Sequence, residues 1–570
     1  MFAARVWGFL GLVALPLQAQ LANPEYYSLF QEAGASTETR LINSTGEVLH
    51  TWSNGLNAHS GSVAYLREDG LLLRSGQRSG VAGGFLPGSY GTVQLVDPEG
   101  QVLWEFDLQQ ANELTLHHDF KPIGDENVLV TVWEFLDEVE MEALGWQQGP
   151  GETGVWMEGL MEIRPNLEDG SSEIVWEWWL SDHLVQEADA NEANFGVVAE
   201  SPGRVDINFN SGTPRGDYFH ISGIDYNPER DEIVLCPNNI DELWVVDHST
   251  TTAEAATSEG GNSGQGGDLI YRWGNPAVYQ FGGGDGLQFL SGAHDPRWFF
   301  CPEKNEWQLT VHNNDRVDID PGDSDSQVLE LELPFDETGN YVLEEGSAYA
   351  PVAPEVLYEI DPTAPFNFST PFMGGAQKLG NGNLLLTLAT QGQLVEVNLQ
   401  GELVWTADIA NGFVFKAQNY PISFAGLPSV LQVNYEVWRD AYFGTGQAQG
   451  REPEDDLDLD GSANLLEYYA GSDPVDSSSR MILLPEFASG ENGQQMLRVN
   501  FQRRIHRPDL VERFEFSRTL EPWVDEFSSV FLNEEVSRFN DSVEAVTVDV
   551  AIPSDGVRGF FRVLLDTASE

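Results

Sequence analysis

Gly100-Gln101-Val102-Leu103-Trp104 is one of six copies of a short pattern that decides the fold: a turn residue, any residue, two apolar residues, and an aromatic residue or histidine. The other five copies end at His50, Trp176, Tyr271, Tyr358 and Trp405. Successive copies end 54, 72, 95, 87 and 47 positions apart, so this is a repeat with insertions of variable length. A period of about 40–50 residues, built from β-prone runs and Gly/Asn/Asp turns, is typical of a propeller blade of four strands.

A second recurring feature marks the inner hairpins of the blades. They are expected to begin near His59, His118, His220, His294 and Gly375. Five inner hairpins against six outer copies leave one inner strand missing. Residues 412–417 are expected to supply it by pairing with the N-terminal outer hairpin near residues 38–52, which would close the ring and remove open sheet edges. The sequence therefore predicts an all-β fold, with a six-bladed β-propeller over residues 20–425.

Four histidines share one place in this repeat, the start of an innermost strand: His59, His118, His220 and His294. Innermost strands line the central channel of a propeller, so these starts converge at one mouth of it. A single histidine there is most often a turn cap, but four of the ten histidines at one repeat position favour a site. Convergent imidazoles can act as nucleophile, general acid or base, or metal ligands.

The segments around these histidines resemble a known family. The runs LHHDFKPIGDENVLVTVWE from Leu116, DYFHISGIDYNPERDEIVLCPNN from Asp217 and LSGAHDPRWFF from Leu290 are similar to the bacterial arylsulfate sulfotransferases, or arylsulfotransferases. The resemblance covers roughly residues 40–425. It implies a six-bladed propeller that moves a sulfuryl group from an aryl sulfate to a phenol through a sulfohistidine, with no nucleotide donor.

The resemblance also implies a role for individual residues. His294 matches the histidine that becomes sulfated, while His118 and His220 match two that surround the sulfuryl group. His59 is expected to bind substrate at the same mouth. Asn238 falls at the substrate-binding position where the family has an arginine for the sulfate oxygens. A neutral amide cannot provide the bidentate, charge-assisted pair that a guanidinium gives an oxyanion.

Four charged residues flank these histidines in the sequence. Asp119 and Asp295 directly follow two of them, but adjacent strand residues point to opposite faces, so both aspartates are expected to bond turns or backbone rather than the imidazoles. Arg297 and Arg316 lie close to His294 and could replace the missing arginine. A role in blade packing or at the surface is favoured for both.

Composition and the N-terminus indicate an exported protein. The 91 acidic and 28 basic residues give a net charge of −63, which repels nucleic acid and anionic lipid. Residues 1–19 have the form of a signal peptide, since Arg5 precedes an apolar run that is too short to span a membrane. We expect a periplasmic or extracellular protein with no membrane contact after signal cleavage. Cys236 and Cys301 could then form a disulfide or remain two buried thiols.

The C-terminal part is expected to form two further units. Over residues 430–475 the sequence predicts a helix, an EF-hand-like calcium loop and a second helix starting near Leu465. The loop's oxygen ligands would be Asp456, Asp458, Asp460, Ser462, Asn464 and Glu467. Alternating runs over residues 480–570 predict a small β-sandwich, a candidate attachment module. Within the fourth blade, the polar, Gly-rich residues 250–267 are expected to be disordered.

Three functions of different classes remain open. The first is sulfuryl transfer between phenols, which the histidine set favours. The second is a propeller that has lost catalysis and binds a ligand or protein in its channel, which Asn238 favours. The third is a metalloenzyme, for which close H-x-H or H-x-x-x-H pairs are missing.

Overall fold

The computed structural model describes residues 26–431 except 34–37, 45, 54–62, 77–87, 109–113, 148–152, 193, 210–215, 282–287, 303, 316–324, 345–346, 360–363, 399, 411–412, 423 and 425. After residue 431 it describes 439, 455–456, 458–459, 462–470, 484–489, 495–504, 510–517, 531–538, 543–551 and 560–567. The signal peptide predicted at the N-terminus and His59 therefore lie outside the described residues.

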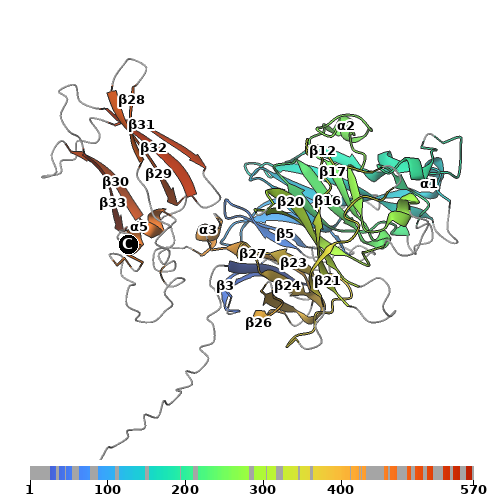
Figure 1. Ribbon diagram of the computed structural model, residues 1–570, viewed down its shortest axis with the longest axis horizontal. Helices are drawn as coiled ribbons and strands as arrows, with labels where there is room; N and C mark the ends of the chain where they lie inside the picture. Colours follow the sequence, from blue (N-terminus) through green and yellow to red (C-terminus); the bar gives the residue numbers. More distant parts are fainter. Residues whose placement is uncertain are drawn as a thin grey trace, which may run out of the picture.

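Six antiparallel blades form a β-propeller, as predicted (Figure 1). The strands of each blade are given from the axis outwards. The first blade consists of β27 (Phe413–Pro421), β1 (Tyr26–Ala33), β2 (Glu38–Ile42) and β3 (Val48–Ser53), and the second of β4 (Ala64–Leu66), β5 (Leu72–Gly76), β7 (Thr92–Val96) and β8 (Val102–Asp107). The third consists of β9 (Leu114–Ile123), β10 (Asn127–Asp137), β11 (Gly154–Pro165) and β12 (Ser172–Trp179), with β6 (Ser89–Tyr90) paired to β9, and the fourth of β15 (Ile221–Asn227), β16 (Glu232–Pro237), β17 (Leu243–Asp247) and β18 (Tyr271–Trp273). The fifth consists of β19 (His294–Cys301), β20 (Glu306–Asn313), β21 (Gln327–Glu332) and β22 (Glu355–Glu359), and the sixth of β23 (Gly375–Lys378), β24 (Leu384–Leu388), β25 (Gln393–Val397) and β26 (Leu403–Asp408).

Each of the six copies of the repeat ends on the outermost strand of a different blade, so successive copies are one blade apart in the sequence. Their last residue reaches the following blade in four cases. The His50 ring bonds the carbonyl oxygen of Pro98, and Trp104 Nε1 donates to Ser172 Oγ at 3.0 Å. Trp176 and Tyr271 make the same kind of contact with the next blades. A large ring with a polar tip therefore joins neighbouring blades at this repeat position.

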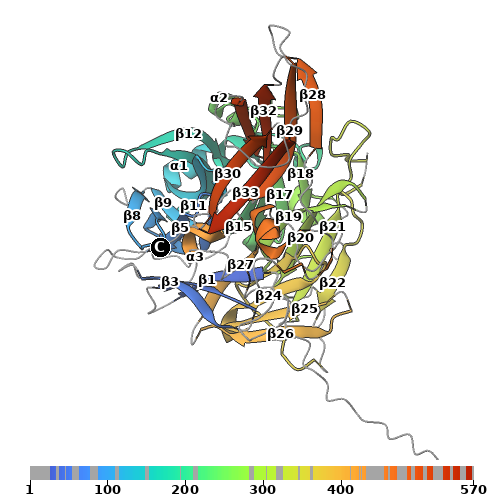
Figure 2. The same ribbon diagram turned by 90° about the vertical axis from the view of Figure 1, so that its left-hand side faces the viewer.

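Both ends of the propeller meet in one blade, as predicted, but the strand next to β27 differs from the prediction. β27 pairs with β1, which in turn pairs with β2 (Figure 2). The blade therefore begins at Tyr26, before the hairpin near residues 38–52 that was expected to pair with it. Closure leaves β27, the last propeller strand in the chain, among the innermost strands around the axis.

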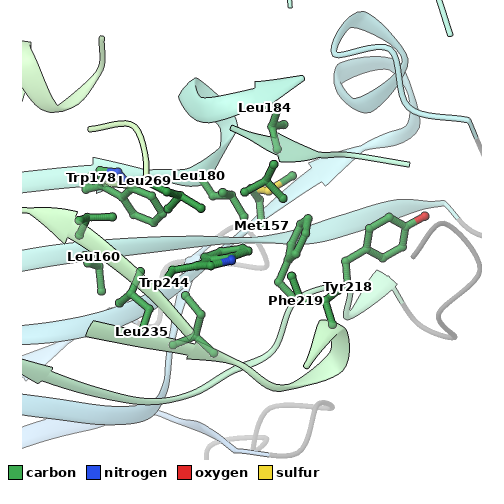
Figure 3. Close-up of a cluster of buried hydrophobic side chains, with 14 of the residues drawn as sticks. Met157, Leu160, Trp178, Leu180, Leu184, Tyr218, Phe219, Leu235, Trp244 and Leu269 are labelled. Atoms are coloured by element: carbon green, nitrogen blue, oxygen red, sulfur yellow. The ribbon is translucent and has the colours of Figure 1, made fainter. Parts of the chain in front are cut away.

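Buried apolar clusters fill the spaces between blades. The largest lies between the third and fourth blades and includes Leu160, Trp178, Phe219 and Trp244, each at most 2% exposed (Figure 3). Phe219 packs at 5.9 Å from the ring of Trp244. This packing anchors the backbone directly before β15, where His220 lies.

Helices and short strands occupy loops between blade strands: α1 (Glu138–Ala143), η1 (Leu180–His183), β13 (Leu184–Val185), η2 (Val198–Glu200), β14 (Val205–Asp206), η4 (Asn238–Ile240), α2 (Thr252–Ala255), η5 (Pro276–Tyr279) and η6 (Ala389–Gln391). The prediction of a disordered loop at residues 250–267 was wrong. Side chains order it, because Thr251 and Glu254 form a capping box on α2 and Asp247 accepts bonds from the backbone of Ser249 and Ser263.

The C-terminal region contains α3 (Leu427–Leu431), α5 (Asn464–Ala470) and six strands: β28 (Leu484–Ser489), β29 (Gln495–Arg504), β30 (Leu510–Ser517), β31 (Phe531–Arg538), β32 (Val543–Ala551) and β33 (Phe560–Thr567). They form a four-stranded sheet, β28-β29-β32-β31, and a separate pair, β30-β33 (Figure 1). That these two sheets form a sandwich remains a prediction. No helix in the described part of the chain is long and apolar enough to cross a membrane.

Candidate active site

Three of the four predicted histidines come together at one mouth of the channel. The ring centroids of His118 and His220 lie 4.3 Å apart. His118 and His294 each lie 5.9 Å from the ring of Phe415, which comes from β27. Side chains from the third, fourth and fifth blades and from the closing strand therefore share one site.

Local backbone irregularities place these histidines. The pairing of β9, β15 and β19 with the next strand shifts register beside His118, His220 and His294 respectively. His118 and His220 have φ angles of 44° and 56°, in the left-handed region that residues with a Cβ seldom adopt. Bulges re-aim side chains, and backbone strain of this kind concentrates at functional sites.

The surroundings of His294 fix its tautomer. Its Nδ1 lies 2.9 Å from the carbonyl oxygen of Gly292 and 2.7 Å from Oδ1 of Asn314. Both neighbours are acceptors, so Nδ1 carries the proton. The Asn314 amide is itself oriented, since its Nδ2 donates to the carbonyl oxygens of Thr370 and Met373. Nε2 of His294 therefore holds the lone pair, toward which the Met373 backbone N–H points at 3.3 Å.

Burial keeps His294 neutral. His294 is 5% exposed. Burial lowers the pKa of its imidazole to about 4, while the hydrogen bonds to Asn314 and Gly292 act to raise it. A neutral imidazole with a lone pair on Nε2 is the form that can act as a nucleophile. With its pKa at about 4, His294 is in this neutral form at neutral pH.

His220 has the opposite electrostatic environment. Its Nδ1 bonds Oδ2 of Asp217 at 2.8 Å. Burial alone would lower the pKa of His220, but the hydrogen bond and charge of Asp217, together with the charge of Glu158, raise it above the ordinary value. The site therefore pairs a neutral imidazole at His294 with one that favours the cationic form at His220.

Asn238 lies beside His294, where the family resemblance predicted a substrate-binding residue. Its Nδ2 donates to the carbonyl oxygen of Ala293 at 3.2 Å and lies 3.4 Å from His294 Nδ1, a second donor. The amide contributes no charge to the site. Arg297 does not replace the missing guanidinium, because it bonds Asp295, Gln418 and the backbone of Ala417. Arg316 lies outside the described residues.

A buried ionic network lies behind the histidines. Lys416 Nζ on β27 contacts Oδ2 of Asp119 at 2.6 Å and Oδ1 of Asp295 at 3.1 Å, and all three side chains are fully buried. Arg297 and Lys416 lower the pKa of Asp295 to about 2, against the effect of burial. Tyr65 donates its hydroxyl to Asp119. The network joins four blades at the axis.

The two aspartates also bond backbone, as predicted for them. Asp119 accepts from the backbone N–H of Ile224, and Asp295 accepts from that of Ala376. Each thereby ties its own blade to the next. No hydrogen bond between these carboxylates and an imidazole is found in the described part of the site, although the charge of Asp295 acts to raise the pKa of His294.

Two residues that sequence analysis missed stand behind His118. His117 Nδ1 lies 3.1 Å from His118 Nδ1, and its Nε2 lies 2.9 Å from Oε2 of Glu158. His117 and Glu158 are both fully buried. The other carboxylate oxygen, Oε1, accepts from Trp133 Nε1 and from the backbone of Ile221. A glutamate between the apolar residues Met157 and Leu160 of β11 was the available sequence signal.

The Cys236 thiol borders this site, because it donates to the carbonyl oxygen of Ala293 at 3.3 Å. Cys236 and Cys301 are buried and not joined in a disulfide, and burial raises the pKa of Cys236 to about 12. Among the described residues, no three His, Cys, Asp or Glu side chains are placed so that they could hold a metal ion. Asp460, one of the predicted calcium ligands, falls outside that set. α5 begins at Asn464, within the predicted loop and one residue before the predicted start near Leu465, and Asn464 and Glu467 are both completely buried.

Comparison with known protein families gives a match over most of the propeller. A family model described as Arylsulfotransferase (ASST) matches residues 63–410. No curated protein matches.

Several solved structures share weak similarity. A protein of unknown function from Bacteroides caccae is 11% identical, with 69% of this chain and 98% of that chain covered and a TM-score of 0.37. The periplasmic gluconolactonase of Pseudomonas aeruginosa is 12% identical, with 69% and 98% covered and a TM-score of 0.34. AztD from Citrobacter koseri is 10% identical, with 70% and 98% covered and a TM-score of 0.30. Likeness at this level carries no argument about function.

Proposed function

Because the chain belongs to the arylsulfotransferase (ASST) family, we propose that it transfers a sulfuryl group from an aryl sulfate to a phenolic acceptor through a sulfohistidine at His294. No nucleotide sulfate donor takes part. The observation that carries the proposal is the tautomer of His294, protonated at Nδ1 and with its lone pair on Nε2.

In the first half-reaction, Nε2 of His294 attacks the sulfur atom in line with the bond to the phenolic oxygen. The N–S bond forms as the S–O bond breaks, and the phenolate leaves with a proton from a neighbouring imidazole. Positive charge develops on the ring of His294. Gly292 and Asn314 stabilise that charge, because both accept a hydrogen bond from Nδ1–H.

In the second half-reaction the acceptor phenol returns the proton to the neighbouring imidazole and its oxygen attacks the sulfur. The S–N bond breaks and neutral His294 is restored. His118 is the proton carrier that we assign to both steps, because it lies beside His220 and shares Phe415 with His294. Each cycle moves one sulfuryl group and leaves the protein unchanged.

The sulfuryl oxygens need positive charge, which Asn238 cannot supply. We assign that role to His220, whose bond to Asp217 favours the imidazolium form. A charge-assisted N–H donor is roughly twice as strong as a neutral one. His59 is proposed to complete substrate binding at the same mouth.

Mass spectrometry of the intact protein tests the proposal. After exposure to 4-nitrophenyl sulfate without acceptor, the wild-type chain is expected to gain one sulfuryl group, and addition of phenol should remove it. His294→Ala should gain none while keeping its melting temperature. A folded His294→Ala protein that still releases 4-nitrophenol at the wild-type rate would rule out this nucleophile.

A second function is supported by one observation, the amide of Asn238 in the place of the family's arginine. Without that charge, the propeller would bind a ligand or protein in its channel and catalyse nothing. Calorimetric binding of an aryl sulfate with no adduct and no turnover would favour this alternative.

For the C-terminal part we propose a structural calcium ion held by Asp456, Asp458, Asp460, Ser462, Asn464 and Glu467. The support is chemical: carboxylate and amide oxygens suit Ca²⁺, and the predicted ligands Asn464 and Glu467 are fully buried. We also propose export to the periplasm or beyond, with the strands after residue 480 as an attachment module.

A further inference from the structure

The side chains behind His118 form a chain of contacts that ends in a carboxylate. Glu158 lies on β11 and His117 on β9, with Trp133 on the strand between them. The rings of His117 and Trp133 stack with centroids 4.0 Å apart and planes 1° apart. This stacking holds the imidazole of His117 between Glu158 and His118.

Glu158 is an unusual group to bury in such a place. It is 0% exposed, and its Oε1 has two neutral donors, Trp133 Nε1 at 3.0 Å and the backbone N–H of Ile221 at 2.9 Å. Among the described residues, the polar atom that Oε2 faces is His117 Nε2, at 2.9 Å, in the geometry of an ion pair rather than of a linear hydrogen bond. A buried carboxylate is retained at this cost where it stabilises a neighbouring charge.

We propose that Glu158 and His117 are positioning residues that set the protonation of His118 and relay its proton during sulfuryl transfer. The proposal rests on the function proposed above and adds two residues to its mechanism. The contact between the two Nδ1 atoms, at 3.1 Å, requires that one donates and the other accepts.

Before transfer, His117 carries protons on both nitrogens and pairs with ionised Glu158. His117 Nδ1–H then donates to His118 Nδ1, so the proton of His118 lies on Nε2. When the phenolate leaves, it takes that Nε2 proton, and the proton on His117 Nδ1 moves to His118 Nδ1. His117 is left neutral, with its remaining proton on Nε2 toward Glu158. The acceptor phenol reverses both shifts, so the proton count balances over a cycle.

The relay explains how one imidazole can serve as acid and then as base without solvent exposure. His118 remains neutral in both states, and only the side of the ring that holds the proton changes. The positive charge rests on His117 before transfer, where the carboxylate of Glu158 stabilises it, and it returns there when the acceptor phenol gives up its proton. Without Glu158, His117 cannot hold the second proton and the relay stops.

Glu158→Gln tests this directly, because the introduced amide has the same shape. Its oxygen can keep the bonds to Trp133 and Ile221, while its NH₂ group faces His117 Nε2 and forces the proton of His117 onto Nδ1. His118 then keeps a fixed proton on Nε2. Removing the charge of Glu158 takes away one of the influences that favour the imidazolium of His220, but the bond to Asp217 remains. KM for the donor should therefore rise much less than kcat falls, and kcat should fall about 10²-fold, the lower end of what general acid–base catalysis contributes.

The choice of donor separates a relay from a structural role. 4-Nitrophenolate leaves without a proton, so the rate of sulfohistidine formation from 4-nitrophenyl sulfate should fall less than about fivefold in Glu158→Gln. Phenyl sulfate needs the proton and should show the full loss of about 10²-fold. Equal losses with both donors would overturn the relay.

Glu162→Gln is the matched control. Glu162 lies on the same strand, is 6% exposed and also bonds a histidine, His248, at 3.1 Å. His248 directly follows β17, the third strand outwards in its blade, and its Nδ1 bonds Asp231. This variant should leave kcat and the donor dependence unchanged, and a loss like that of Glu158→Gln would contradict the proposal.

Nitrogen NMR of ¹⁵N-histidine protein tests the relay without turnover. In the wild type, His117 should show two protonated nitrogens near neutral pH; in Glu158→Gln it should show one. Identical His117 signals in both proteins would overturn the relay. If the wild-type protein makes no sulfohistidine, the proposed function fails, while this spectrum still decides whether Glu158 controls the protonation of His117.

Discussion

Replacing Lys416 with methionine should destabilise the propeller more than any other lysine substitution in the described chain. Lys416 has no exposed side-chain surface and lies between two carboxylates, Asp119 and Asp295, that are also fully buried. Methionine fills a similar volume but leaves both carboxylates without their shared cation. Removing one partner of a buried pair costs about 3–5 kcal/mol.

The low end of that range applies here, because each carboxylate keeps other donors. Asp119 retains Tyr65 and Asp295 retains Arg297. We therefore expect a loss of about 3 kcal/mol. With an unfolding entropy of about 2.1 cal/mol/K per residue over roughly 400 propeller residues, the melting temperature should fall by about 4 °C.

Differential scanning calorimetry of the full chain measures this shift. Lys304→Met is the control, because Lys304 and its partner Glu332 are largely exposed and such pairs contribute little. Adding Asp119→Asn to Lys416→Met should recover part of the loss by removing one uncompensated charge. A Lys416→Met protein that melts within about 1 °C of the wild type would refute the reasoning, because so small a shift corresponds to a loss of stability well below the range for buried pairs.

Three further predictions concern the site and the C-terminal loop. Asn238→Arg should raise kcat/KM for aryl sulfates, by up to about 10²-fold, because it adds a charged donor for the sulfuryl oxygens; an unchanged or lower value in steady-state assays would mean that His220 already supplies that charge. Turnover should be constant from neutral pH down to about pH 5 and fall as the pH approaches 4, where His294 gains a proton and loses its lone pair. It should also fall in alkali, when His220 loses its proton. A pH–rate profile with its acid limb near 6.5 would contradict the assignment of the acid limb to His294. Calcium at about 100 times its dissociation constant should stabilise the C-terminal part of the full chain by about 2.7 kcal/mol in calorimetry, and Glu467→Ala should abolish the effect without changing turnover; identical traces with calcium and with chelator would remove the metal.

Features that repeat along the chain could be predicted from the sequence. The six outer-strand copies are visible because the same interblade contact is needed in every blade, as with Trp104 and Ser172. The convergence of His118, His220 and His294 followed from their equivalent place in the repeat. Ring closure followed from a count of inner and outer hairpins.

Features that depend on one-time contacts could not be predicted. β1 lacks clean alternation in Tyr26–Ala33, so its place between β27 and β2 depends on ring closure rather than on its own pattern. Residues 250–267 have the composition of a disordered segment, yet bonds from Asp247 and the cap at Thr251 order them. Glu158 reads as an exposed strand position until the pairing of β9, β10 and β11 places it beside His117.

The site depends on β27, the last strand of the propeller to be synthesised. Phe415 and Lys416 are among the last propeller residues to leave the ribosome, yet they contact groups on β9 and β19 that are made long before. A nascent or truncated chain that ends before Phe413 lacks both the ring between His118 and His294 and the cation between the two aspartates. Such a chain cannot assemble the site, so the proposed activity would be acquired only when the whole propeller has been made and its two ends have met.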